Sequence, residues 1–120
     1  MTQKLKLIIF TAALGVAAVF FGGTAHAATI NVVAGTDDIA TNGDCQLSEA
    51  IININDQAQT YADCAAGDGN NDTITLPTGT ITLSDNFPVI SQALHIVGQL
   101  MSSTIIDGDS GQFTVFDTNN

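Results

Sequence analysis

Lysine and arginine are absent from this chain after residue 6. The two basic residues are Lys4 and Lys6, whereas all twelve acidic residues lie further along the sequence. A surface that carries only negative side chains repels nucleic acid and anionic lipid, so such partners are disfavoured. Calcium is one candidate counter-charge, since Asp carboxylates and backbone carbonyl groups suit Ca²⁺. The favoured alternative is that the acidity only keeps the surface soluble, for instance in a salty medium that screens self-repulsion.

A catalytic constellation is also missing. His95 is the only histidine beyond the N-terminal segment, and its apolar neighbours favour a structural role for it. No carboxylate pair is fixed by a shared strand motif, as the acid and base of a glycoside hydrolase would be. The sequence therefore predicts a protein that is not an enzyme by itself, with calcium as the one cofactor left open.

The N-terminal 27 residues have the composition of a secretory signal peptide. Lys4 and Lys6 form a basic start, and an uncharged, mostly apolar run follows from Leu7 to Gly23. Ala25 and Ala27 supply the small residues that a signal peptidase recognises. We predict cleavage after Ala27 and export to the periplasm, cell surface or medium, with no membrane span after cleavage. An uncleaved anchor is the alternative, but the run barely reaches the ~20 residues that a spanning helix needs.

The two cysteines, Cys45 and Cys64, are predicted to form a disulfide, because such bonds persist in exported proteins. The loop of about 20 residues that they close would add about 3 kcal/mol of stability in the chain-entropy model. A metal site is a weaker interpretation, since no CxxC motif or His pair is present. A catalytic cysteine is weaker still, because only His95 could serve as its base.

Residues 46–55 are predicted to form an amphipathic helix. Apolar residues at helical spacing mark one face, and an acidic residue stands in the first turn: Leu47, Ala50, Ile51, Ile54 and Glu49. The opposite face is expected to hold Ser48, Asn53 and Asn55. Asp44 is the expected N-cap. A helix of about ten residues is marginal alone, so packing must hold it in place.

Beyond Gly69 the chain changes to short strands separated by Pro and Gly. The predicted strands are Asp72–Leu76, Gly79–Leu83, Ala93–Val97, Ser103–Asp107 and Phe113–Phe116. Strand centres recur at steps of about 20 residues, for example from Thr75 to Ile96 and from Ile81 to Ile105, which fits stacked coils of a β-solenoid. A small antiparallel β-sandwich is the alternative, because its turns also recur at short intervals.

Alternation along the strands predicts which side chains face the interior. The expected interior residues are Ile74, Leu76, Ile81, Leu83, Leu94, Ile96, Ile105, Phe113 and Val115. Ile106 and Phe116 are expected on the outer face. The outward residues Thr73, Thr75, Thr80 and Thr82 could dock a glycan or a surface protein, or could simply form the polar side of the strands.

Two acidic turns are candidate calcium sites. Asp68, Asn70 and Asp72 lie in a Gly- and Asp-rich stretch that partly resembles the nonapeptide of calcium-binding β-rolls, in one imperfect copy. Asp107 and Asp109 could offer oxygen ligands in the same way. For either segment the favoured alternative is an ordinary turn, in which a glycine adopts positive φ.

The segment from Gly43 to Leu83 resembles the CSLREAI-type segment at the front of secreted bacterial right-handed parallel β-helix proteins of the pectin-lyase-like kind. The matching positions are Cys45, Leu47, Glu49, Ala50 and Ile51, whereas Gln46 and Ser48 replace the family's Ser and Arg. The resemblance implies a mainly β fold. Residues 28–71 would form an N-terminal cap with a strand, the helix and the disulfide loop, and residues 72–120 would form the first β-helix coils.

The resemblance also implies a structural, non-catalytic cap of a longer surface or secreted protein with a role in adhesion or binding. The alternatives are the front part of a polysaccharide-active β-helix lyase or hydrolase, whose active site lies downstream, and a small calcium-dependent binding protein. The last predicted strand is followed by no second cap, so we expect the chain to be the first part of something longer. Its open end would recruit another copy or a partner strand.

Overall fold

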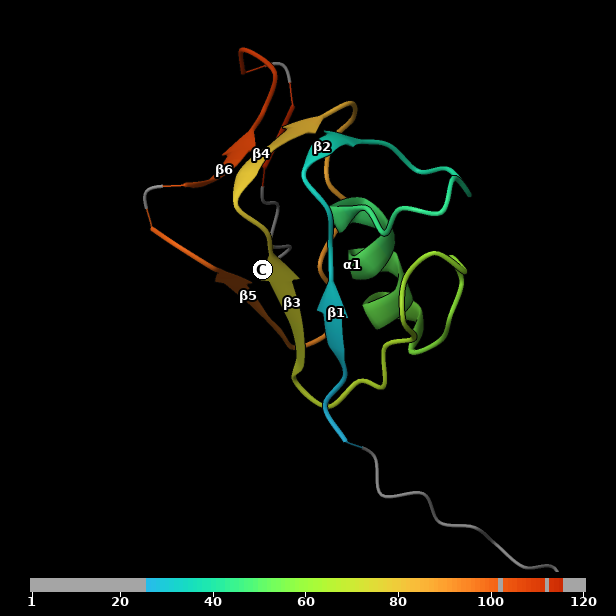
Figure 1. Cartoon of the computed structure of the whole chain (residues 1–120). Coiled ribbons are helices and arrows are strands. Elements are labelled where there is room, and N and C mark those ends of the chain that lie inside the picture. The colour runs from blue at the N-terminus through green and yellow to red at the C-terminus, as the bar shows by residue number, and fades with distance from the viewer. Residues whose placement is uncertain (1–25, 102, 112, 116–120) are drawn as a thin grey trace, which may run out of the picture.

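The computed structural model describes residues 26–101, 103–111 and 113–115 (Figure 1). The basic start, the apolar run and Ala25 of the predicted signal peptide lie outside the described residues, as does Phe116. In the part that is described, no helix is both long and apolar enough to cross a membrane.

Six short strands form two parallel sheets (Figure 1). The first sheet consists, in spatial order, of β1 (Thr29–Asn31), β3 (Asp72–Leu76) and β5 (Leu94–Gly98). The second consists of β2 (Gly35–Asp37), β4 (Gly79–Leu83) and β6 (Thr104–Asp107). The chain thus passes from the first sheet to the second three times. All pairings between the described strands are parallel, so the antiparallel pairing of a β-sandwich is not found there.

The predicted strand bounds agree with the structure where the apolar alternation is strong. Strands β3 and β4 have the predicted bounds, whereas β5 and β6 each begin one residue later than expected. Residues 113–115 do not form the predicted strand. Strands β1 and β2 have three residues each, and the sequence indicated only one strand, without bounds, in this part of the chain.

The pairing register corrects one predicted interior residue. Strands β4 and β6 pair Thr80 with Ile105 and Ile81 with Ile106. Because alternate residues face opposite sides of a sheet, Ile106 lies on the inner side with Ile81. Ile105 was expected inside, but its side chain is 52% exposed, and Ile106 packs against the core. The sequence related Ile81 to Ile105, one residue before its true partner Ile106. The predicted inner and outer positions of Ile105 and Ile106 were therefore exchanged.

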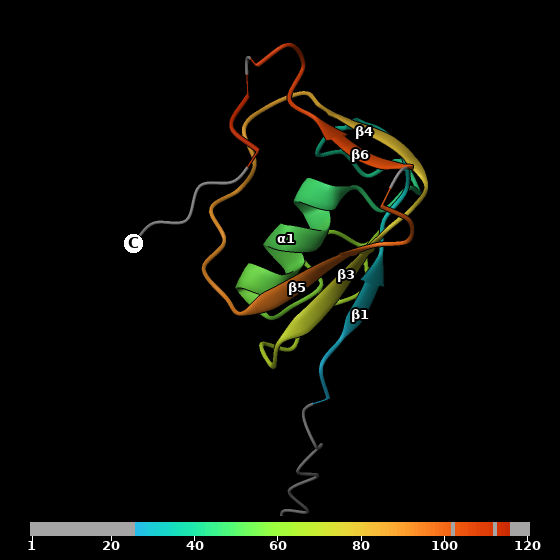
Figure 2. The same ribbon diagram turned by 90° about the vertical axis from the view of Figure 1, so that its left-hand side faces the viewer.

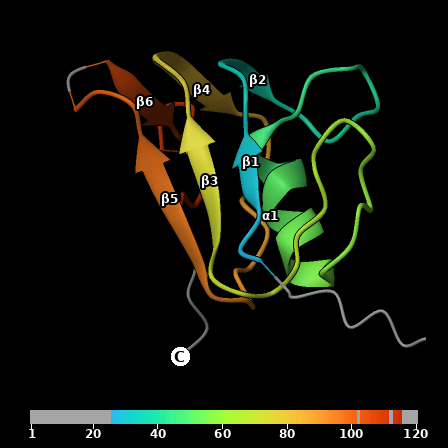
Figure 3. The same ribbon diagram turned by 60° about the horizontal axis from the view of Figure 1, so that its bottom comes forward.

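The helix α1 (Leu47–Asp56) covers the sheets on the side of β1 and β2. It lies one residue later than the predicted range, and its apolar residues Leu47, Ala50, Ile51 and Ile54 are each 0% exposed. Figure 2 shows β5 passing in front of α1, and Figure 3 shows α1 beside β1 with β5 and β6 on the other side of the molecule. Within each sheet the strands follow one another from the side of α1 to the opposite side. We call this arrangement the stack, with α1 at one end and β5 and β6 at the other.

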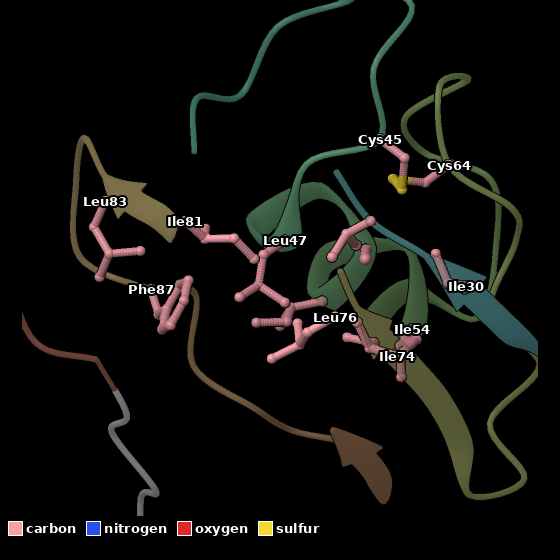
Figure 4. Packing of buried hydrophobic residues seen from close by; sticks show 13 residues of the cluster. Ile30, Cys45, Leu47, Ile54, Cys64, Ile74, Leu76, Ile81, Leu83 and Phe87 are labelled. Carbon is pink, nitrogen blue, oxygen red and sulfur yellow. A yellow bond between two sulfur atoms is a disulfide. The ribbon is translucent and has the colours of Figure 1, made fainter. Parts of the chain in front are cut away.

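Buried apolar side chains from both sheets meet α1 in a single core (Figure 4). Its members are Ile30, Val32, Cys45, Leu47, Ala50, Ile51, Ile54, Cys64, Ile74, Leu76, Ile81, Leu83 and Phe87. Four of the predicted interior residues are fully in this core, and four more pack against it while partly exposed: Leu94, Ile96, Phe113 and Val115. Val32 and Phe87 were not predicted, because neither lies in a predicted strand.

Three segments outside the two sheets are linked by hydrogen bonds. Helix α1 is bonded to residues 86–91, and these are bonded to residues 113–115. Asn55 Nδ2 donates to the Val89 carbonyl at 2.8 Å, and Asn55 Oδ1 accepts from the Ser91 N–H at 2.9 Å. The Phe87 N–H donates to the Thr114 carbonyl at 3.3 Å. In Figure 2 the orange segment between β4 and β5 runs on the side away from both sheets. Each passage through the two sheets is thus followed by a segment on this third side.

Truncation of a buried α1 residue should separate packing from helix propensity. We expect Ile51→Ala to lower the free energy of unfolding by about 2–5 kcal/mol, because it leaves a cavity between α1 and the sheets. The neighbouring Ile52 is only partly buried, so Ile52→Ala is a matched control with less than half that loss. Urea unfolding followed by circular dichroism measures both. Equal losses would contradict the placement of α1.

Candidate functional site

The first turn of α1 receives a buried carboxylate from the end of β2. Asp37 is 3% exposed, and its Oδ1 accepts from the Ser48 N–H at 3.0 Å while Oδ2 accepts from the Ser48 hydroxyl at 2.6 Å. N–H groups in a first turn lack partners within the helix and form the positive end of its dipole, so they stabilise this negative charge. Ser48 was expected on the outer, polar face. It is buried instead, because Asp37 supplies it with a partner.

Glu49 is a second buried carboxylate in the same turn. Its Oε1 accepts from the Ala40 N–H at 3.1 Å and its Oε2 from the Gln46 N–H at 3.2 Å. Gln46 is the N-cap residue, so the prediction of Asp44 as N-cap is wrong. The carbonyl of Cys45 accepts from the Val33 N–H at 3.0 Å, which holds the residue before the N-cap alongside the residues after β1. Gln46 and Glu49 therefore occupy the two positions of a capping box.

The disulfide between Cys45 and Cys64 is confirmed, and it joins the start of α1 to the loop that follows the helix. Asn53 organises this loop. Its Nδ2 donates to the carbonyls of Tyr61 and Ala65, both at 3.0 Å, and its Oδ1 accepts from the Tyr61 N–H at 2.8 Å. Asn53 is 0% exposed, although the sequence placed it on the outer face. A buried amide is stable there because the loop backbone satisfies it.

Asp72, the first residue of β3, is the third buried carboxylate. Its Oδ1 accepts from the Ala28 N–H at 2.7 Å, and its Oδ2 accepts from the N–H groups of Asp68 and Gly69 at 3.0 and 3.2 Å. Burial raises the pKa of Asp72, but these donors together outweigh burial and hold the pKa below its ordinary value of 3.8. The carboxylate thus ties the loop before β3 to the start of β1.

The other predicted calcium ligands make local turns. Asp68 Oδ1 accepts from the Asn70 N–H at 3.0 Å, and Asp107 Oδ1 accepts from the Asp109 N–H at 3.1 Å, as Asp does in Asx-turns. Over residues 26–101, 103–111 and 113–115, no three Asp, Glu, His or Cys side chains gather so that they could hold a metal ion, and no pocket is found. Calcium binding stays a prediction that no assembled set of ligands supports.

Strands β5 and β6 lie at the outer edges of the two sheets, at the end opposite α1. Large apolar side chains are exposed there: Val97 by 49%, Ile105 by 52%, Leu100 by 59%, and Met101 fully. We call β5, β6 and the turn residues Leu100 and Met101 the open edge. Val97 and Ile105 lie on the outer faces of their sheets, next to the partly buried inward residues Ile96 and Ile106. The sequence predicted an open end but did not identify Val97 or the turn residues as part of it.

His95, for which the sequence favoured a structural role, faces away from the core. It pairs with Thr73 in the register of β3 and β5, and its side chain is exposed. The inner positions beside it belong to Leu94 and Ile96, which pack against the core.

Comparison with known proteins found no matching family model, no similar curated protein and no similar solved structure. Function is therefore inferred from the helix-covered end, the open edge and the N-terminal sequence.

Acid should destabilise the fold through Asp72. Its folded pKa lies below the unfolded value, so its contribution to stability is complete above an unfolded pKa of about 3.9 and is lost as pH falls through the folded pKa. We expect Asp72→Asn to lower the free energy of unfolding at pH 7 by about 1–3 kcal/mol and to flatten its dependence on acid pH. Urea unfolding at a series of pH values measures this.

The exposed Asp44 provides a matched control for this experiment, because Asp44→Asn makes the same chemical change outside the buried network. We expect that variant to keep the acid dependence of the unmodified chain. An acid dependence in Asp72→Asn as steep as in Asp44→Asn would contradict the role given to Asp72.

Proposed function

We propose that this chain is an exported, non-catalytic structural unit that begins a right-handed parallel β-helix. Residues 28–71 cap one end of the helix, and the open edge accepts the next strands at the other end. The order of the chain supports this proposal, since each passage through the two sheets is followed by a segment on the third side. Those segments are α1, then 86–91, then 113–115.

The contrast between the two ends of the stack is the observation that carries the proposal. At one end, α1 buries its apolar side chains fully against the sheets. At the other, β5 and β6 are edge strands, and their inward residues Leu94, Ile96 and Ile106 are only partly buried against the core. In a stacked fold each coil contacts only its neighbours and offers its backbone N–H and C=O groups to the next. A cap at one end and a template at the other is the arrangement expected of the first coils.

Export is supported by the N-terminal sequence together with the disulfide. The basic start, the apolar run and the small residues Ala25 and Ala27 form a signal-peptide pattern. The bond between Cys45 and Cys64 is of a kind that persists outside the cytoplasm. A secreted or surface protein with the same cap is also what the resemblance to CSLREAI-type segments implies.

Adhesion or binding, with a glycan or a surface protein as partner, stays a prediction for the assembled β-helix. So does the alternative of a polysaccharide-active enzyme with its active site in later coils. Of the outward threonines, Thr80 is exposed, whereas Thr73, Thr75 and Thr82 are only partly exposed. The described residues pair no carboxylates around a pocket.

A second copy of the processed chain can serve as the next strands in a test of the open edge. We expect the exported protein to associate with rising concentration in sedimentation velocity experiments. The backbone amides of β5 and β6 should exchange with deuterium more slowly in the assembled species, because the free edge strands of the second copy, its own β5 and β6, accept and donate hydrogen bonds there. A monomer at all concentrations, with unchanged exchange in β5 and β6, would contradict the proposal.

Lysine substitutions locate the surface involved. We expect Val97→Lys and Ile105→Lys to weaken association at least tenfold, since charged side chains on an edge oppose strand addition. The matched controls are Val89→Lys and Ile39→Lys, which replace apolar residues exposed to a similar extent, 41% and 49%, outside the open edge. Equal weakening by both pairs would indicate unspecific apolar association instead.

A further inference from the structure

Ala28, the residue that follows the predicted cleavage site, is held to β3 by two hydrogen bonds. The Ala28 N–H donates to Asp72 Oδ1 at 2.7 Å, and the Ala28 carbonyl accepts from the Thr73 N–H at 2.8 Å. The preceding residue, Ala27, is exposed. The first atom of the predicted processed chain, the Ala28 nitrogen, thus lies against a fully buried carboxylate.

That carboxylate has no lysine or arginine to pair with, because none follows Lys6 in the sequence. Its N–H donors keep Asp72 ionised at neutral pH, but a backbone N–H carries only a partial positive charge. The bond from the Ala28 N–H already has an ionised acceptor, and a full positive charge on the donor would add Coulomb attraction to it. A cation at the position of the Ala28 nitrogen would therefore stabilise Asp72 further.

We propose that signal-peptide cleavage creates this cation, so that the new N-terminal ammonium group of Ala28 binds Asp72 and completes the fold after export. The inference rests on the export part of the proposed function. A signal peptidase hydrolyses the bond between Ala27 and Ala28 with one water molecule. The water oxygen bonds to the Ala27 carbonyl carbon, and the C–N bond breaks. Both water protons end on the Ala28 nitrogen, so that Ala27 ends in a carboxylate and Ala28 begins with –NH₃⁺.

The sign of the effect follows from the titration of the new group. An unpaired α-amino group has a pKa of about 7.7–8.0, and a neighbouring carboxylate raises the pKa of the folded form. The added stability is then complete below the unfolded pKa and is lost as pH rises through the folded pKa. The processed chain should thus lose stability in alkali as well as in acid, whereas a chain with an amide at Ala28 should lose it only in acid.

Three other titratable residues bear on the charge at Asp72, namely Asp68, His95 and Glu49. Asp68 hydrogen-bonds to Asp72 from the loop before β3. On β5, Leu94 stands opposite Asp72, and His95 pairs with Thr73 on the outer face. On α1, Glu49 directs its oxygens to Ala40 and Gln46. The titratable group that hydrogen-bonds to Asp72 is thus Asp68, and its negative charge also favours a cation at Ala28. His26, which precedes Ala28, is removed with the signal peptide.

The absence of lysine allows a selective test on the processed protein. In residues 28–120 the α-amino group of Ala28 is the only primary amine, so acetylation after export removes its charge and keeps an N–H for Asp72. Mass spectrometry of the exported protein should first show that it begins at Ala28. Urea unfolding is then compared between the free and acetylated proteins from pH 6 to pH 10.

We expect the free protein to be more stable below pH 8 and the difference to vanish in alkali. Each unit by which the folded pKa exceeds the unfolded one makes the folding equilibrium constant tenfold larger below pH 7. NMR titration should place the α-amino pKa above 8.0, and Asp68→Asn, which retains Asp72, should reduce the shift less than Asp72→Asn does. Asp72→Asn should abolish it wherever that variant folds.

A start other than Ala28, equal stability of the free and acetylated proteins, or an unshifted α-amino pKa would each overturn the inference. These results are independent of the association measured at the open edge. If association persists while acetylation has no effect, only the processing step is rejected and the capping function stands.

Discussion

Backbone N–H groups stabilise the buried carboxylates of this protein, in the place where lysine or arginine would stand in most others. Asp37 uses an N–H group in the first turn of α1, Glu49 uses two N–H groups around the helix start, and Asp72 uses three. A backbone donor is positioned only when its segment is folded. The burial of these charges is therefore compensated only in the native arrangement, which couples the cap to the strands.

This coupling extends over long stretches of chain. Asp72 joins the start of β1 to the start of β3 across 44 residues, and Asp37 joins β2 to α1 across 11. Short buried hydrogen bonds of this kind are screened by salt much less than ion pairs on a surface. A chain rich in acidic residues thereby gains charge-assisted contacts inside the cap, while the other carboxylates among the described residues are partly or fully exposed.

The sequence predicted the elements whose pattern is local. The apolar stripe of α1 and the alternation in β3 and β4 needed no knowledge of distant segments. Strands β1 and β2 are too short to show alternation and form only against β3 and β4. Ser48 and Asn53 were assigned to the outer face because a helical pattern shows polarity but not the partners that make burial of a polar group favourable. Two adjacent isoleucines, Ile105 and Ile106, fit either face, and the pairing of β6 with β4 decides between them.

The asymmetry between the ends of the stack determines the direction in which it can grow. Strands β1 and β2 are also edge strands, but α1 lies beside them, and covering an edge with a helix is one way in which proteins prevent unwanted strand addition. The Asp72 carboxylate fixes the start of β1 at the same end, so the covered edge is also the most strongly tethered part of the first sheet. In the proposed β-helix, growth by parallel pairing would then be available at β5 and β6 and not at β1 and β2. The buried Asp72 carboxylate at the first strand would thus help to set the order in which later strands are added.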